Sequence, residues 1–281
     1  MSELTIGGQA LIEGVMMRSN DKYAICVRRP DKKISTKIIK IKQNKHWFPN
    51  LPLIRGVYRF VDTMAMGVKS ISYSAVESQG EAEENLTSWD MVLTLVFSIG
   101  VTILLFYALP LFLTKLFIAS IGVWFNLIDG IFRLAIFVLY LLIISMVPDI
   151  KRIFQYHGAE HKTVYCYENK EKLTVKNIQK YPTLHPRCGT NFILIVFVLS
   201  IFFFSLIEAE TYFHRLGLRI LLLPLIAGVS YEILKFAGKH FDNIFVKILI
   251  SPGLLMQKIT TKQPTDEMVE VAIKSLKAAL S

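Results

Sequence analysis

Cysteine is scarce in this chain, and long stretches carry no charge. The 281 residues include three cysteines, Cys26, Cys166 and Cys188, too few and too widely spaced for a disulfide framework. They are free thiols or metal ligands. No charged residue lies between Asp90 and Lys115, which is enough helix to cross about 30 Å of hydrocarbon. With 53% hydrophobic residues and a mean hydropathy of +0.44, the chain is not an ordinary soluble domain.

Several common signatures are also missing. No basic segment leads into an apolar run at the start of the chain, so no cleavable signal peptide is expected. Gly7-Gly8 is not followed by Lys-Ser or Lys-Thr, which excludes a phosphate-binding loop there. The net charge of +10 is not accompanied by an RNA-recognition, zinc-ribbon or helix-turn-helix pattern. We therefore expect no nucleic-acid partner and attribute the charge to loops that face a lipid bilayer with anionic headgroups.

Charge placement separates membrane from aqueous parts. Four apolar runs are candidate transmembrane helices, near residues 89–113, 131–147, 191–207 and 216–233. Thirteen Lys and Arg residues lie in 1–88, eight in 148–190 and seven after Glu232, which leaves four elsewhere. Basic residues concentrate on the cytoplasmic side of membranes. This pattern predicts a multi-pass protein of the cell membrane with both termini and the 148–190 loop in the cytoplasm.

The predicted fold class is a mainly α membrane protein with about four transmembrane helices, a small N-terminal antiparallel β-meander and cytosolic amphipathic helices. The strands are expected at Ala10–Arg18, Lys22–Arg29 and Lys33–Lys42. Leu53–Val76 has a helical period and is expected to lie on the bilayer or under the membrane helices. The second membrane helix is expected to continue, kinked, past Pro148.

Four regions follow along the chain. Residues 1–50 form a cytosolic β-rich region, and 51–88 hold the amphipathic helix and an acidic linker. Residues 89–235 form the four-helix membrane region, which includes the cytosolic loop 148–190 with its polar motifs. Residues 236–281 form a cytosolic helical tail.

The densest chemistry lies between the second and third apolar runs. His157 and His161 are four residues apart, so on a helix they project from one face, and Glu160 completes a His-x-x-Glu-His pattern. In this order two imidazoles hold Zn²⁺ and the carboxylate acts as base on bound water. His185 or Cys188 can supply a third ligand, because both runs meet the same membrane face. The sequence therefore predicts a divalent metal ion, with zinc as the first choice.

Plainer interpretations stay open for the same residues. The two histidines can be interfacial polar side chains bonded to lipid phosphate or backbone, and Gly158 weakens the helix that would align them. Arg187 can be a positive charge on the inner face. Cys188 can instead be a reactive thiol, because a neighbouring arginine and a helix N-terminus both favour the thiolate.

The N-terminal string from Gly7 to Arg18 is the second unusual feature. Its paired glycines allow positive φ or a close backbone approach. Glu13 and Arg18 flank an otherwise apolar strand, so each can point into a site or be an exposed charge on an edge strand. We take both as catalytic candidates beside Glu160 and Arg187.

Three strings carry a resemblance to a known family: GGQALIEGVMMR at 7–18, YHGAEHKTVYCYE at 156–168 and HPRCGTNF at 185–192. With these strings, the chain resembles the DUF1385 family of YqhQ-like bacterial membrane proteins over nearly its whole length. The resemblance implies a protein of the bacterial inner membrane and a predicted metal-dependent enzyme, and it says little about the reaction. The signature positions correspond to Glu13, Arg18, His157, Glu160, His161, His185, Arg187, Cys188 and Asn191.

The leading functional prediction is a metal-dependent membrane enzyme, most simply a hydrolase at the cytosolic interface. The predicted metal ligands are His157, His161 and either His185 or Cys188. Glu160 is the general base, and Arg187 or Arg18 stabilises an anion or oxyanion. A homo-oligomer is compatible with this prediction.

The alternative is a non-catalytic membrane scaffold or transporter-associated subunit, in which the polar strings form a structural or ion-binding junction. A scaffold predicts that the histidines face headgroups and do not converge on His185 or Cys188. A transport path requires ionisable groups inside the spans, and the middles of the first three apolar runs carry none.

Overall fold

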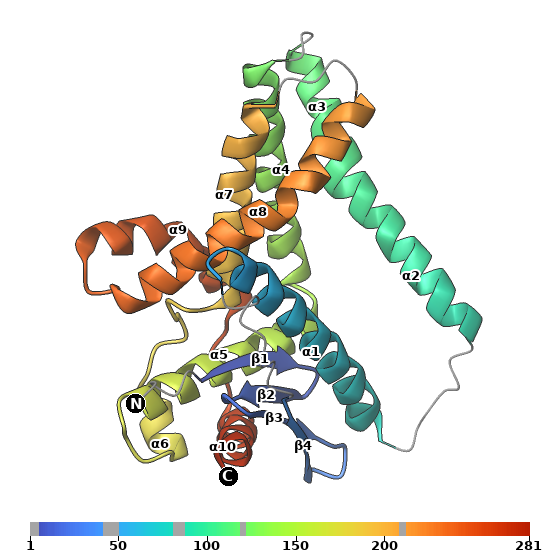
Figure 1. Ribbon diagram of the computed structural model, residues 1–281. Helices are drawn as coiled ribbons and strands as arrows, with labels where there is room; N and C mark the ends of the chain where they lie inside the picture. Colours follow the sequence, from blue (N-terminus) through green and yellow to red (C-terminus); the bar gives the residue numbers. More distant parts are fainter. Residues whose placement is uncertain (1–5, 42–50, 81–87, 119–121, 208–211) are drawn as a thin grey trace.

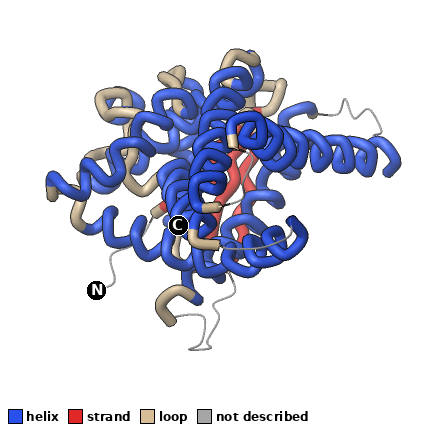
Figure 2. Tube along the Cα trace, turned by 90° about the horizontal axis from the view of Figure 1, so that it is seen from above, coloured by secondary structure: helices blue, strands red, loops and turns tan. Residues whose placement is uncertain are grey.

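The computed structural model describes residues 6–41, 51–80, 88–118, 122–207 and 212–281. At one end of the molecule a sheet packs between helices, and a set of apolar helices stands on this unit (Figure 1). Seen from above, helices surround the strands, and α2 (Ser88–Ile103) stands to one side in both views (Figure 2). The expected mainly helical class with an N-terminal antiparallel sheet is confirmed.

In the part of the chain that the structure describes, the sheet has four antiparallel strands in chain order, β1 (Gly7–Leu11), β2 (Gly14–Arg18), β3 (Lys22–Arg28) and β4 (Ile34–Lys40). The meander is confirmed, but the single strand expected at Ala10–Arg18 is wrong. Two strands, β1 and β2, meet there at a turn formed by Ile12 and Glu13. Glu13 has a φ of 50°, a conformation that favours glycine or asparagine, so the residue types did not indicate the turn.

Both faces of the sheet are buried, because alternate residues of β2 and β3 point to opposite sides. On one side Val15 and Cys26 pack with α5 (Pro148–Glu168) and α10 (Asp266–Leu280). On the other side Met16 and Ile25 pack with Met66 of α1 (Ile54–Gln79). The sheet is thus the middle of three layers, and it fixes the position of α5.

Within the described residues, three helices are long and apolar enough to cross a membrane, namely Val92–Phe117, Val123–Ile144 and Leu216–Lys239. They comprise α2 with a π-helical turn η2 (Leu104–Ala108) and α3 (Leu109–Phe117), then α4 (Val123–Ile144) and most of α8 (Tyr212–Lys239). The remaining apolar helix, α7 (Gly189–Ser205), has 17 residues and therefore rises only about 25 Å. Four crossings remain a prediction, since α7 is shorter than the hydrocarbon layer of about 30 Å.

The helix expected to run kinked past Pro148 instead breaks. α4 ends at Ile144, and α5 begins at Pro148. Val147 is extended, with φ −70° and ψ 127°, because the ring of a following proline disfavours helical backbone. The break lets α5 lie along the sheet rather than continue α4 (Figure 1). Two further helices complete the described chain, α6 (Val175–Ile178) and α9 (Ile244–Thr260).

A buried charged cluster lies among the apolar helices. Asp129 of α4 is 1% exposed, and its Oδ2 accepts hydrogen bonds from Arg133 at 3.0 Å and from Arg219 of α8 at 3.1 Å. The apolar run at 131–147 does lack charge in its middle, but the helix itself starts at Val123 and includes Asp129 and Arg133. The absence of ionisable groups was the sequence argument against a transport path through these helices. This argument therefore does not hold for α4.

Candidate metal centre

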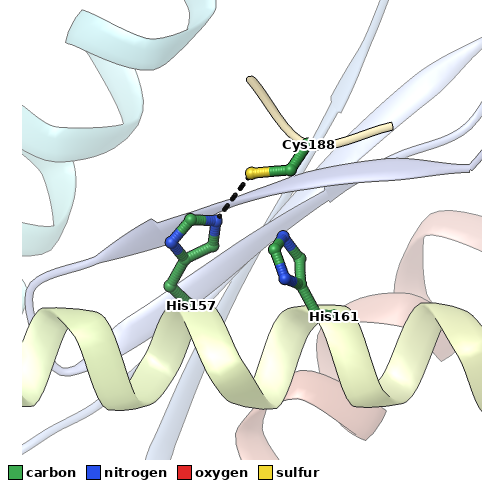
Figure 3. Close-up of side chains that lie close together, drawn as sticks. All are labelled: His157, His161 and Cys188. Carbon is green, nitrogen blue, oxygen red and sulfur yellow. Dashed lines mark hydrogen bonds between the residues drawn. The ribbon is translucent and has the colours of Figure 1, made fainter. Parts of the chain in front are cut away.

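His157 and His161 lie one turn apart on α5 and point to the same side, toward Cys188 (Figure 3). Their ring centroids are 4.3 Å apart. α5 begins with Pro148 and carries Asp149 in its first turn, residues that suit the start of a helix and its dipole. The helical face that the four-residue spacing predicted is confirmed.

Cys188 approaches the pair from the opposite side, where it caps the N-terminus of α7. Its Sγ accepts a hydrogen bond from the Thr190 amide at 3.4 Å and lies 3.3 Å from Nε2 of His157. Together with His161, these residues bring one ligand atom each to within 4.8 Å of one another. Ligand atoms on a tetrahedral zinc lie roughly 3.3–3.7 Å apart, so a contraction of about 1 Å would fit the cluster around the ion.

Backbone carbonyls set the tautomers of both histidines. Nδ1 of His157 lies 2.8 Å from the Thr260 carbonyl oxygen, and Nδ1 of His161 lies 2.5 Å from that of Thr183. A carbonyl only accepts, so each Nδ1 carries the proton and each Nε2 presents a lone pair. Burial, and then the neighbouring His157, lower the pKa of His161, which favours the neutral form that binds metals.

Gly158 makes the first of these contacts possible. A Cβ at this position would stand 2.1 Å from the Lys262 carbonyl oxygen, far inside van der Waals contact. The chain after α9 passes so close to α5 that the Lys262 amide donates to the Phe154 carbonyl at 2.8 Å. A glycine that weakens helix propensity is therefore what lets Thr260 reach His157.

His185 lies beside the cluster rather than in it. Its ring centroid is 5.6 Å from that of His161, and its Nδ1 accepts from the Arg187 amide at 3.3 Å. The proton is then on Nε2, which is buried, lies 3.5 Å from Oε2 of Glu168 and makes no hydrogen bond within the described residues. Burial lowers the pKa of His185 to about 4, against the opposing effect of the Glu160 carboxylate.

Gln257 of α9 holds the backbone of His185 from both sides. Its Oε1 accepts from the His185 amide at 2.7 Å, and its Nε2 donates to the His185 carbonyl at 2.9 Å and to Asn191 Oδ1 at 3.1 Å. Gln257 is fully buried, so these bonds satisfy a side chain that could not otherwise be accommodated. They fix the segment that carries Cys188.

Glu160 is buried between α5 and the sheet. A Cβ at Gly8 of β1 would stand 2.8 Å from Cγ of Glu160, and the Gly8 amide hydrogen-bonds the carboxylate. Burial raises the pKa of Glu160, while His157 and His185 oppose this rise. The predicted close approach at the paired glycines is therefore present, and its partner is the glutamate of the motif.

The remaining candidates form ion pairs. Arg187 pairs with Glu168 at the C-terminal end of α5. Glu13 pairs with Arg152 of α5 at 2.5 Å and accepts from the Tyr156 hydroxyl at 3.3 Å. Arg18 pairs with Asp62 of α1 at 3.0 Å. The structure thus places Glu13 and Arg18 in contacts that tie the sheet to its two helical layers.

Sequence reasoning missed the residues that hold the ligands in place. Thr183 and Thr260 act through backbone carbonyls, which every residue carries, so their identities gave no signal. Gln257 did offer one, since it is an uncharged polar residue within an apolar stretch of α9. A buried amide requires hydrogen-bond partners, and this requirement could have suggested a structural role.

Comparison with known proteins places the chain in a family. It is 35% identical to the Bacillus subtilis (strain 168) protein YqhQ, described as uncharacterized, over 98% of this chain and 92% of that protein. No solved structure matches. Residues 51–281 match the model of a family described as a protein of unknown function, DUF1385. The chain therefore belongs to the DUF1385 family.

Proposed function

We propose that the chain is a metal-dependent membrane enzyme, a hydrolase that acts at the cytosolic membrane interface. The observation that supports this most is the convergence of His157, His161 and Cys188, although 31 positions separate the first from the last. A scaffold gives no reason for such convergence. The cluster therefore favours the enzyme over the scaffold.

The donor set suits a catalytic metal. Two imidazoles and a thiolate are ligands for zinc, and imidazole also suits iron and copper. Three protein ligands leave one position for water or substrate, as in catalytic zinc sites. Bound there, the metal would lower the pKa of a coordinated water and supply hydroxide near neutral pH. The protonated Nε2 of His185 makes Cys188 the better third ligand.

Glu160 is the residue that we assign to proton transfer. It lies on α5 between the two histidines in sequence, and its side chain packs closely against Gly8 of β1. We assign anion stabilisation to Arg187, which neighbours Cys188, rather than to Arg18, which pairs with α1. Glu13 then acts as a positioning residue, because it contacts Arg152 and Tyr156 within two turns of His157.

The same proposal places the protein in the cell membrane. The three long apolar helices would cross the bilayer with α7 as a shorter fourth crossing. The distribution of Lys and Arg supports a cytoplasmic location for both termini. The sheet and the metal cluster would then lie on the cytosolic side, below the apolar helices in Figure 1.

The contact between Cys188 and His157 supports a second candidate, an enzyme with a cysteine nucleophile. The two side chains are 3.3 Å apart, and Cys188 lies at the N-terminus of α7. An adjacent imidazole can activate a thiol without a metal. The two candidates differ in whether the purified protein holds a metal ion.

Metal content is the deciding measurement. The chain is purified in mild detergent without a polyhistidine tag, and its metals are measured by mass spectrometry beside the variants His157→Ala and Cys188→Ser. His240→Ala is the matched control, because this exposed histidine follows the end of α8 and its Nδ1 bonds the Phe236 carbonyl. Near-stoichiometric metal that is lost in both site variants and kept in the control supports the enzyme. A folded wild type that stays metal-free after reconstitution contradicts it.

A further inference from the structure

α9 separates two environments. Its inner face carries Val246, Ile250, Gly253, Gln257 and Thr260, all buried against the rest of the chain. Its outer face carries large apolar side chains that contact nothing in the described chain over most of their surface. Their exposed fractions are 61% for Ile244, 78% for Phe245, 62% for Ile248, 56% for Leu249 and 59% for Leu255.

The inner face of α9 reaches both ligand-bearing segments. Gln257 holds the His185 backbone, and the Thr260 carbonyl orients His157. Gly253 lies so close to Asn191 of α7 that a Cβ there would stand 2.2 Å from Oδ1 of Asn191. α9 is therefore the element through which α7, the Cys188 segment and His157 are joined.

The outer face of α9 matches a bilayer surface. The helix follows α8 directly, and in Figure 1 the two helices form a hairpin that projects sideways where the apolar helices meet the sheet layer. Lys235, Lys239, Lys247 and Lys258 accompany a single acid, Asp242, between positions 235 and 260. An apolar face with basic flanks next to a membrane-crossing helix is the pattern of an interfacial helix on anionic lipid.

We propose that α9 lies at the boundary of headgroups and acyl chains, and that this contact holds Gln257 and Thr260 against the two segments that carry Cys188 and His157. Gln257 and Thr260 are positioning residues, and the lipid surface is a structural partner of the cluster. The interpretation of that cluster as a metal site rests on the proposed function. The position of α9 rests on the membrane location in that proposal, but neither this position nor its effect on Cys188 requires a bound metal.

The depth of α9 is tested in vesicles of phosphatidylethanolamine and phosphatidylglycerol with brominated acyl chains. Ile248→Trp is introduced into the full chain after Trp47, Trp89 and Trp124 are replaced by phenylalanine. Bromine is expected to quench this tryptophan strongly. Ile38→Trp on β4 is the matched control, since Ile38 is 50% exposed but belongs to the sheet layer, and its emission should not change. An unquenched tryptophan at 248, including one shielded by a second copy of the chain, overturns the proposal.

The coupling is tested by the rate at which a water-soluble maleimide alkylates Cys188, measured by mass spectrometry of its peptide in chelator-treated vesicles. Ile248→Glu should draw α9 out of the lipid and raise this rate about tenfold or more, since buried hydrogen bonds to the Cys188 segment are lost. Gln257→Leu should do the same while the outer face stays apolar. Ile38→Glu should leave the rate within about twofold.

An unchanged rate in Ile248→Glu, with α9 at the lipid boundary, overturns the coupling. If Ile248→Glu fails to fold, Gln257→Leu still tests whether α9 holds the Cys188 segment, and the tryptophan measurement still tests the position of α9 in the lipid. Neither measurement requires a bound metal, so a wild type without metal contradicts the proposed function alone.

Discussion

Replacement of Gly158 by alanine should have two opposite effects on the free energy of unfolding. Alanine is favoured over glycine in a helix interior by about 1 kcal/mol. Against this, the new Cβ would stand 2.1 Å from the Lys262 carbonyl oxygen, whereas real Cβ contacts essentially never fall below 3.0 Å. The chain at Lys262 and α5 must therefore separate by about 0.9 Å.

The separation removes two contacts. If Thr260 moves with Lys262, its distance to His157 Nδ1 grows from 2.8 Å to about 3.7 Å, beyond hydrogen bonding. The bond of 2.8 Å from the Lys262 amide to Phe154 is lost in the same way. Each loss costs about 0.5–1.5 kcal/mol, so the variant should range from neutral to about 2 kcal/mol less stable. Loss of the group that orients a histidine of the proposed metal site should weaken metal binding there about 10- to 100-fold.

Thermal unfolding in detergent and competition with a chelator measure the two effects separately. Gly100→Ala is the matched control, because a Cβ there meets nothing within 4 Å. The control should keep its metal affinity and be at least as stable as the wild type. A Gly158→Ala variant that is more stable than the wild type and binds metal as tightly would refute the packing argument.

Three further changes test other parts of the molecule. Asp129→Leu should destabilise the protein by about 3–5 kcal/mol in thermal unfolding, because the buried Arg219 and the partly buried Arg133 lose a carboxylate partner, while exposed Asp242→Asn should not; equal midpoints would contradict a buried ion pair. Thr265→Ala should cost about 1 kcal/mol, since its hydroxyl caps α10 by accepting from the Met268 amide; no loss would mean that the cap is dispensable. Arg29 lowers the pKa of Glu77. The ion pair of Glu77 with Arg29 therefore stabilises the protein above the ordinary glutamate pKa, and this stabilisation is lost as pH falls through the lowered pKa. The difference in unfolding midpoint between wild type and Arg29→Gln should therefore shrink from about pH 6 to about pH 3, and a constant difference would contradict the assignment.

Local patterns determined most of the secondary structure. Uncharged runs predicted the long apolar helices, and the four-residue spacing predicted one helical face for His157 and His161, because a helix repeats every 3.6 residues. Short β-rich stretches predicted the meander. The turn at Ile12 and Glu13 was not predicted, because Glu13 has positive φ without being a typical turn residue.

The partners of the charged candidates depended on tertiary structure. Glu13 and Arg18 looked alike in sequence, as charges at the ends of an apolar strand. Only the packing of the sheet between α5 and α1 decided that one pairs with Arg152 and the other with Asp62. Likewise Gly8 and Gly158 were visible as glycines, but the groups that approach them come from distant segments.

The choice of a third ligand between His185 and Cys188 likewise depended on tertiary structure. The sequence by itself determined that two imidazoles share a helical face and that a third donor lies before the next apolar helix. It could not rank the two donors, because only the folded chain brings Cys188 Sγ to 3.3 Å from Nε2 of His157, which is 31 residues away. Periodicity records contacts within one helix, whereas a hydrogen bond between distant segments exists only once the chain has folded.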